Sequence, residues 1–137
     1  MECLIFMSEL VSLSYASHAT GGVVADAALA DILRVSQKNN VTHELTGALI
    51  YGNGRFIQVL EGPLEPLLAT MERIRSDPRH HSIDVVGPVS LDRREFPDWC
   101  MARVLLEPDL EPAFQSILDN WPMGRAASQL LVKALAL

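Results

Sequence analysis

The segment Leu45–Glu61, which reads LTGALIYGNGRFIQVLE, decides the fold of this chain. LTGALIY and RFIQVLE are short runs rich in apolar, β-branched and aromatic residues, which is typical of strands. Between them, Gly52-Asn53-Gly54 supplies residues that readily adopt the positive φ angles of a tight turn. The segment therefore predicts a β-hairpin in the middle of the chain.

A helical pattern flanks the hairpin on each side. From Val24 to Asn39, apolar residues recur at steps of three and four, which predicts an amphipathic helix. These residues are Ala25, Ala28, Leu29, Ile32 and Val35. After the hairpin, Pro63 suits a first helical turn, and a second apolar stripe follows. Its residues are Leu64, Leu67, Leu68, Met71 and Ile74.

Three more strands are predicted outside this unit. LVSLSYAS alternates, so that Val11, Leu13 and Tyr15 share one face of a first strand. IDVVGPVS and MARVLL give two late strands, and the polar run DPRHHS reads as the turn that ends the second helix. The order β-α-β-β-α-β-β predicts an α+β, ferredoxin-like fold. We expect a five-stranded mixed sheet with two helices on one face.

The tail beyond Pro108 carries two short amphipathic patterns that Trp121-Pro122-Met123-Gly124 separates. We divide the chain into a folded domain over residues 1–107 and a helical extension over residues 108–137. Because an open apolar sheet face is a liability, we expect the extension to cover the far face of the sheet. A dimer surface is the alternative role. Residues 1–6 read as an extension that the fold does not need.

Composition limits the classes of function. A net charge of −6 argues against non-specific nucleic-acid binding, which needs a basic surface. Cys3 and Cys100 form no CxxC pattern, so a reduced, cytoplasmic setting is the simpler interpretation. No stretch predicts a signal peptide or a membrane span.

Enzyme and metal motifs do not occur in the sequence. There is no Walker-type glycine loop, no GxGxxG after a strand, and no histidine with a partner at metal-ligand spacing. Glu61 and Glu65 read as residues that cap a helix start. We therefore predict that the chain is not an enzyme and holds no metal.

Two polar residues interrupt otherwise apolar faces. Tyr15 shares a face with Val11 and Leu13, and by itself it reads as a core tyrosine. Gln58 lies between Phe56 and Leu60, where a buried amide is unfavourable unless its hydrogen bonds are satisfied. Gln58 could instead face water on an edge strand. Burial is less favourable for Gln58 than for Tyr15, so a buried polar ligand on the face of Gln58 is worth considering.

The sequence around these residues resembles the BLUF family of blue-light receptors over Leu10–Met101. RFIQVLEG and DPRHH are the most specific blocks. The full set, in order, is LVSLSYAS, SQKNN, LTGALIY, RFIQVLEGP, IRSDPRHHSI and REFPDWCM.

The resemblance implies a flavin, usually FAD and alternatively FMN, between the two helices on the sheet face. It implies that Tyr15 is the light-driven electron donor and that Gln58 is the amide bridging it to the flavin. Asn40, which closes SQKNN, corresponds to the residue that hydrogen-bonds the ring edge. We also expect Ser17 to make a minor contact with the flavin and Ile32 to make an apolar contact with it.

The resemblance also assigns residues late in the domain. Arg79 and His80 are expected to approach the pyrimidine side of the ring. Trp99 and Met101 correspond to last-strand residues that move when the glutamine rearranges. Cys100 departs from the family, in which serine is more usual at this place.

The function predicted in this way is that of a short blue-light photoreceptor. Its reversible, red-shifted state would signal to an unidentified protein, with no nucleic acid or membrane as partner, and the chain could form a dimer or larger homo-oligomer. The alternatives are a small flavin-dependent oxidoreductase and a ligand-sensing regulatory module.

Overall fold

A computed structural model describes residues 9–122 and 124–135, so the prediction for residues 1–6 lies outside the described residues. The strands are β1 (Leu10–Ala19), β2 (Thr46–Gly52), β3 (Arg55–Pro63), β4 (His80–Ser90) and β5 (Ala102–Leu105). The helices are α1 (Asp26–His43), α2 (Leu64–Arg75), α3 (Glu111–Asp119) and α4 (Gly124–Leu135), with a 3-10 turn, η2, at Thr20–Gly22.

The five strands form one mixed sheet in the order β4-β1-β3-β2-β5. Neighbouring strands are antiparallel except for β2 and β5, which are parallel. This confirms the predicted α+β, ferredoxin-like fold with one added strand. The hairpin is also confirmed, because Gly52 pairs with Arg55 across a turn in which Asn53 and Gly54 have positive φ.

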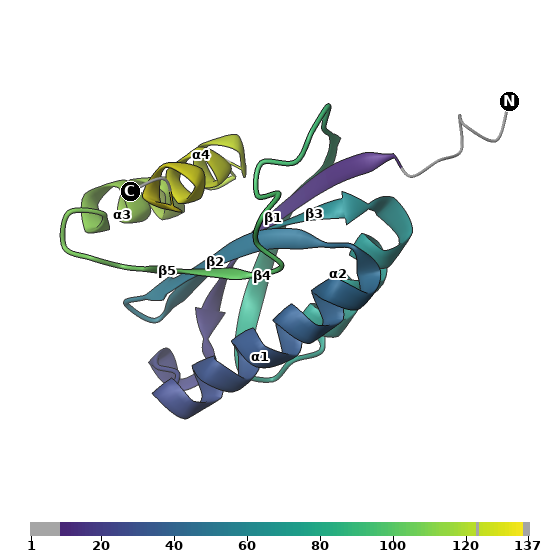
Figure 1. The fold of residues 1–137 in the computed structure, drawn as a ribbon. Helices are drawn as coiled ribbons and strands as arrows, with labels where there is room; N and C mark the ends of the chain where they lie inside the picture. The colour runs from purple at the N-terminus through teal and green to yellow at the C-terminus, as the bar shows by residue number, and fades with distance from the viewer. Residues whose placement is uncertain (1–8, 123, 136–137) are drawn as a thin grey trace, which may run out of the picture.

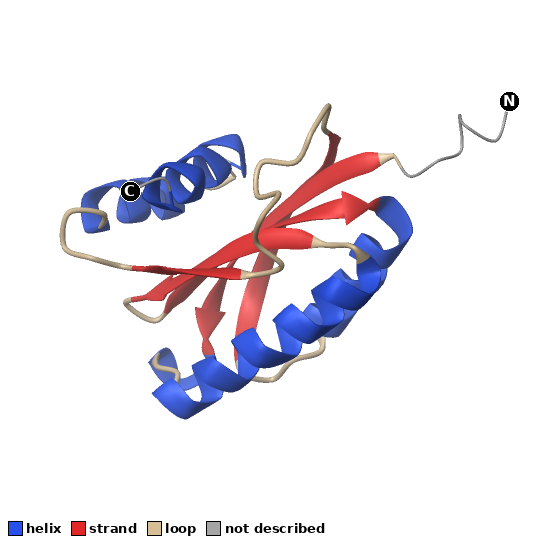
Figure 2. Ribbon diagram, viewed as in Figure 1, coloured by secondary structure: helices blue, strands red, loops and turns tan. Residues whose placement is uncertain are grey.

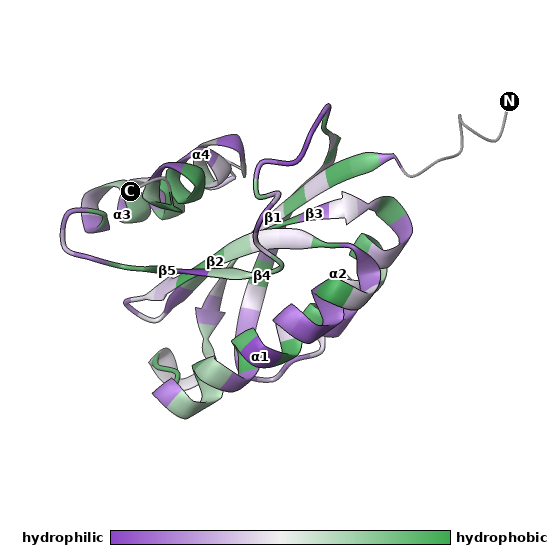
Figure 3. Ribbon diagram, in the orientation of Figure 1, coloured by the Kyte–Doolittle hydropathy of each residue, from purple (hydrophilic) through white to green (hydrophobic). Residues whose placement is uncertain are grey.

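Helices cover both faces of the sheet (Figures 1 and 2). On the α1 and α2 face, the core contains Val11, Leu13, Tyr15, Leu29, Leu49, Leu60, Leu67 and Met71. On the opposite face, α3 and α4 pack on Ala16, Ala48, Ile50, Ile57 and Val59 through Phe114, Ile117, Leu118, Ala127 and Leu131. Figure 3 shows apolar segments along the strands and alternating apolar and hydrophilic segments along α1. Successive strand residues thus serve two separate cores.

Tertiary contacts move several predicted boundaries. The first helix runs on to His43 and ends where Glu44 takes a left-handed conformation. The prediction of a turn over DPRHHS is wrong at its end, because His80 and His81 pair with Ala19 and His18 and belong to β4. Local polarity indicated a turn, but pairing with β1 extends the strand.

The helix α2 differs from its predicted form in two places. It begins at Leu64, and Pro63 precedes it in an extended conformation. Leu68, assigned to the buried stripe, is 43% exposed, because it lies outside the face that Leu67 and Met71 bury. Of the described residues, no helix is long and apolar enough to pass through a membrane.

The expected role of Glu61 as a helix cap is wrong. Glu61 is fully buried in β3, and its carboxylate accepts hydrogen bonds from the Thr46 hydroxyl and from the backbone N–H groups of Glu95 and Phe96. Glu65 does lie in the first turn of α2, where its charge suits the helix dipole. The Glu61 carboxylate instead joins β3 to the connection between β4 and β5.

The tail helices should contribute strongly to stability through their buried face. We expect Phe114→Ala to lower the free energy of unfolding by about 3–5 kcal/mol, because Phe114 is completely buried against the sheet and truncation leaves a cavity. Leu105→Ala is the control, since Leu105 is 54% exposed, and it should change stability by about 0.5 kcal/mol or less. Equilibrium denaturant unfolding measures both; equal effects would contradict this role of α3.

Candidate functional site

A cleft opens between α1 and α2 above the sheet, with about 800 Å³ of space including its mouth. Apolar side chains from α1, β2, β3 and α2 line it together with a larger set of polar side chains. The apolar lining is Ile32, Val35, Leu49, Phe56, Leu60 and Ile74. The polar lining is Tyr15, Ser36, Asn39, Asn40, Gln58, Thr70, Arg73, Asp77, Arg79 and His80.

At the floor of the cleft, Tyr15 and Gln58 are directly opposite each other on β1 and β3. Both side chains are buried, with 5% and 4% exposed. The Tyr15 hydroxyl donates a hydrogen bond of 2.5 Å to Gln58 Oε1, and Gln58 Nε2 donates to Met101 Sδ at 3.4 Å. A continuous chain of hydrogen bonds therefore runs from the phenol through the amide to the thioether.

Burial controls the protonation of the phenol. Removal from water, with a smaller contribution from the charge of Asp77, raises the pKa of Tyr15 well above its usual value. The neutral form holds the proton that is donated to Gln58. Tyr15 is thus a hydrogen-bond donor at any physiological pH.

Trp99 and Met101, which the family resemblance assigned together, have different environments in the structure. Met101 is buried and contacts Gln58, whereas Trp99 is 45% exposed. Both precede β5, which begins at Ala102, so they do not lie in the last strand as expected. The strand starts later because its pairing with β2 begins at Ala48 and Ala102.

Amide side chains of α1 hold the segment that carries Met101. Asn40 is buried, and its Nδ2 donates to the Cys100 carbonyl at 2.5 Å. Gln37 Nε2 donates to the Met101 carbonyl at 3.1 Å. Asn39 donates to Thr70 on α2. The sequence interpretation missed Gln37 and Asn39, although both belong to the SQKNN block that singled out Asn40.

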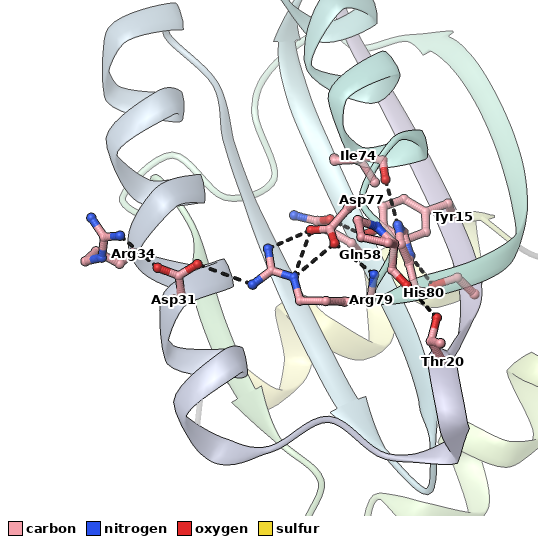
Figure 4. Close-up of polar contacts among 11 residues, drawn as sticks. Tyr15, Thr20, Asp31, Arg34, Gln58, Ile74, Asp77, Arg79 and His80 are labelled. Carbon is pink, nitrogen blue, oxygen red and sulfur yellow. Dashed lines mark hydrogen bonds and ion pairs between the residues drawn. The ribbon is translucent and has the colours of Figure 1, made fainter.

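Charged side chains lie at the mouth of the cleft (Figure 4). Arg79 pairs with Asp77 at 2.7 Å and with Asp31 of α1 at 3.3 Å. The hydrogen bonds from Arg79 lower the pKa of the Asp77 carboxyl. Arg73 Nη1 donates to Asn39. Asp31, Arg73 and Asp77 were absent from the predicted site. Asp77 belongs to the DPRHH block that singled out Arg79 and His80, whereas the fold brings Asp31 and Arg73 to this mouth.

His80 occupies the end of the cleft beside Tyr15, with 5.8 Å between the ring centroids. One ring nitrogen, Nδ1, lies 2.8 Å from Ser17 Oγ, and Nε2 lies 2.7 Å from the Ile74 carbonyl oxygen. Ser17 is fully buried and lies behind His80. Of the predicted contacts, Tyr15, Ile32, Asn40, Gln58, Arg79 and His80 therefore line the cleft.

The side chains of the cleft fit the flavin that the resemblance implies. Apolar walls from Ile32, Leu49 and Phe56 suit a flat aromatic ring system. The amides of Asn40 and Gln58 can each donate and accept, which suits a ring edge with both kinds of group. Arg73 and Arg79 offer cationic donors at the mouth.

Comparison with known proteins agrees with this chemistry. A model of the BLUF family, described as sensors of blue-light using FAD, matches residues 10–102. Photoactivated adenylate cyclase subunit beta of Euglena gracilis is 36% identical over 93 residues, which are 67% of this chain and 11% of that protein. The chain thus matches about a tenth of the length of this curated relative.

Two solved structures resemble the whole of the described fold. BlrB, a BLUF protein in its dark state, has a TM-score of 0.79 and 32% identity, covering 96% of this chain and 100% of that one. BlsA in its photo-activated state has a TM-score of 0.80 and 27% identity, covering 93% and 96%. The chain belongs to the BLUF family of flavin-based blue-light sensors.

Proposed function

We propose that this chain is a light switch whose moving part is the hydrogen-bonded set Tyr15, Gln58 and Met101. The observation that carries the proposal is the chain of hydrogen bonds at the floor of the cleft. When bound, the flavin, which we take to be FAD, supplies absorption of blue light and an excited state that accepts an electron.

Tyr15 is the electron donor of the switch. Its phenol would supply one electron when a bound flavin absorbs light, and its proton would then move to Gln58 Oε1 along the 2.5 Å hydrogen bond. Its neutral ground state and its exclusion from water keep the proton on this path. Return of the electron and the proton restores Tyr15, so the chain consumes no substrate.

Gln58 stores the result as a changed set of hydrogen bonds. Its oxygen end accepts from Tyr15, and its nitrogen end donates to Met101. Rotation or tautomerisation of the amide exchanges donor and acceptor without a change of net charge. In a buried site such an exchange separates two discrete states, because each mismatched bond is costly.

The signal leaves through the segment that follows Met101. The matched part is 11% of the cyclase relative, so most of that protein lies outside it, in line with a sensor that controls another module. We propose that the domain of residues 1–107 passes its signal, through the extension of residues 108–137, to a separate protein or to a second copy of the chain.

Tyr15→Phe should bind flavin normally and lose the reversible red shift under blue light. Phenylalanine preserves the packing on β1 and removes the proton and the oxidisable phenol. Absorption spectra before and after illumination measure the effect. Tyr51→Phe, which changes the other tyrosine of the chain, is the control and should switch normally. A normal red shift in Tyr15→Phe would remove Tyr15 from the mechanism.

Gln58→Leu should also retain flavin and remain in one spectral state, because leucine fills the space and offers no hydrogen bond. The same illumination experiment tests it. Gln115→Leu on the exposed side of α3 is the matched control, and it should leave the shift unchanged. A full shift in Gln58→Leu would contradict the amide switch.

Asn40→Ala should weaken flavin binding by about tenfold, since a buried ring edge then lacks one hydrogen-bond partner. Titration of the apoprotein with FAD, followed by flavin fluorescence, gives the dissociation constant. Asn120→Ala at the exposed end of α3 is the control. Equal affinity in both variants would show that Asn40 does not contact the flavin.

A further inference from the structure

The connection between β4 and β5, residues 91–101, runs from one edge of the sheet to the other and ends at Met101 (Figure 1). It therefore carries the residue that contacts Gln58. What holds this connection in place also determines where Met101 lies.

Glu61 holds the middle of the connection. Its Oε2 accepts the N–H of Glu95 at 2.8 Å, and its Oε1 accepts the N–H of Phe96 at 2.6 Å. The Thr46 hydroxyl donates to the same Oε1 at 2.8 Å. All three donors are uncharged, and the carboxylate has no exposed surface. Arg94 of the same connection donates instead to the Thr46 hydroxyl oxygen and to the Glu61 backbone carbonyl. Such a buried carboxylate is stable only while its donors stay in place.

Four residues, 97–100, separate this clamp, which Glu61 forms with the N–H groups of Glu95 and Phe96, from Met101, and they are held in a compact turn. The Trp99 N–H donates to the Phe96 carbonyl at 3.2 Å, and the Gly47 N–H donates to the Trp99 carbonyl at 3.0 Å. Phe96 itself is buried in the core beneath α3 and α4. A displacement of Met101 is therefore transmitted to Phe96 through a short, folded segment.

The same part of the connection contacts the tail. Ser128 Oγ on α4 donates to Glu95 Oε1 at 2.6 Å, and Arg125 lies 3.6 Å from Glu95 Oε2. The backbone of Glu95 is held by Glu61, and its side chain is held by α4. Glu61 thus holds both the segment that leads to Met101 and the residue, Glu95, that contacts α4.

We propose that Glu61 is a positioning residue for the switch, which holds the β4–β5 connection so that Met101 contacts Gln58. This deepens the proposed function and rests on it. In β3, Gln58 faces the cleft and Glu61 faces the opposite core, so Glu61 acts on Met101 through the connection and touches neither Tyr15 nor Gln58. Movement of Met101 away from Gln58 strains the hydrogen bonds that the N–H groups of Glu95 and Phe96 donate to Glu61. Glu61 thereby favours the dark state, in which Met101 contacts Gln58.

Glu61→Gln tests this role with little change of shape, because the amide replaces one acceptor oxygen by a donor that faces an N–H group. We expect unchanged flavin content and, in NMR spectra of protein labelled with methyl-¹³C methionine, a shifted Met101 resonance in the dark. Dark recovery should slow about five- to tenfold, because one buried polar group is then left unsatisfied. Glu65→Gln, four residues on and exposed, is the control and should match the wild type in all three.

A second variant with a smaller change keeps the test valid if Glu61→Gln does not fold. Thr46→Val removes one of the three donors to Glu61 and also the acceptor of Arg94 Nη1, while both N–H groups remain bound to Glu61, so it should slow recovery in the same direction by a smaller factor. An unchanged Met101 resonance with unchanged or faster recovery in Glu61→Gln would overturn the positioning role. A wild-type chain that shows no red shift would overturn the proposed function instead, while the Met101 resonance in the dark still tests the clamp.

Discussion

The hydrogen bond from Tyr15 to Gln58 is the interaction on which the other features of the site depend. It exists only because β1 and β3 pair in one register, with Tyr15 opposite Gln58. A slip by one residue would turn one of the two side chains to the opposite core. The apolar residues on both faces of β1 and β3 fix this register, because each face packs in its own core. The position of this one polar contact therefore depends on the packing of the whole sheet.

Burial gives that contact its properties. The two cores keep water from both faces of the sheet, and this raises the pKa of Tyr15 and leaves Gln58 few partners besides Tyr15 and Met101. The central strand β3 then carries Gln58 toward the cleft and Glu61 toward the far core. Gln58 contacts Met101, and Glu61 accepts a hydrogen bond from Glu95. Both side chains therefore bind the same connection, residues 91–101.

The sequence predicted the parts of the molecule that local patterns encode. Alternation placed Tyr15 on the apolar face of the first strand and Gln58 between Phe56 and Leu60, and the Gly52–Gly54 run predicted the hairpin; the link between Tyr15 and Gln58 came from the family resemblance. It could not predict the ion pair of Arg79 with Asp31 or the burial of Glu61, because those contacts join segments far apart in the chain. His80 and Trp99 were misplaced for the same reason, since strand pairing alone decides where β4 and β5 begin.

The central claim is that light rearranges the hydrogen bonds of the Gln58 amide. Its most direct test is the light-minus-dark infrared difference spectrum of the flavin-loaded chain, recorded with and without ¹³C,¹⁵N-labelled glutamine. We predict side-chain amide bands that shift with the label and disappear in Gln58→Leu. Identical difference spectra in labelled and unlabelled protein would contradict it.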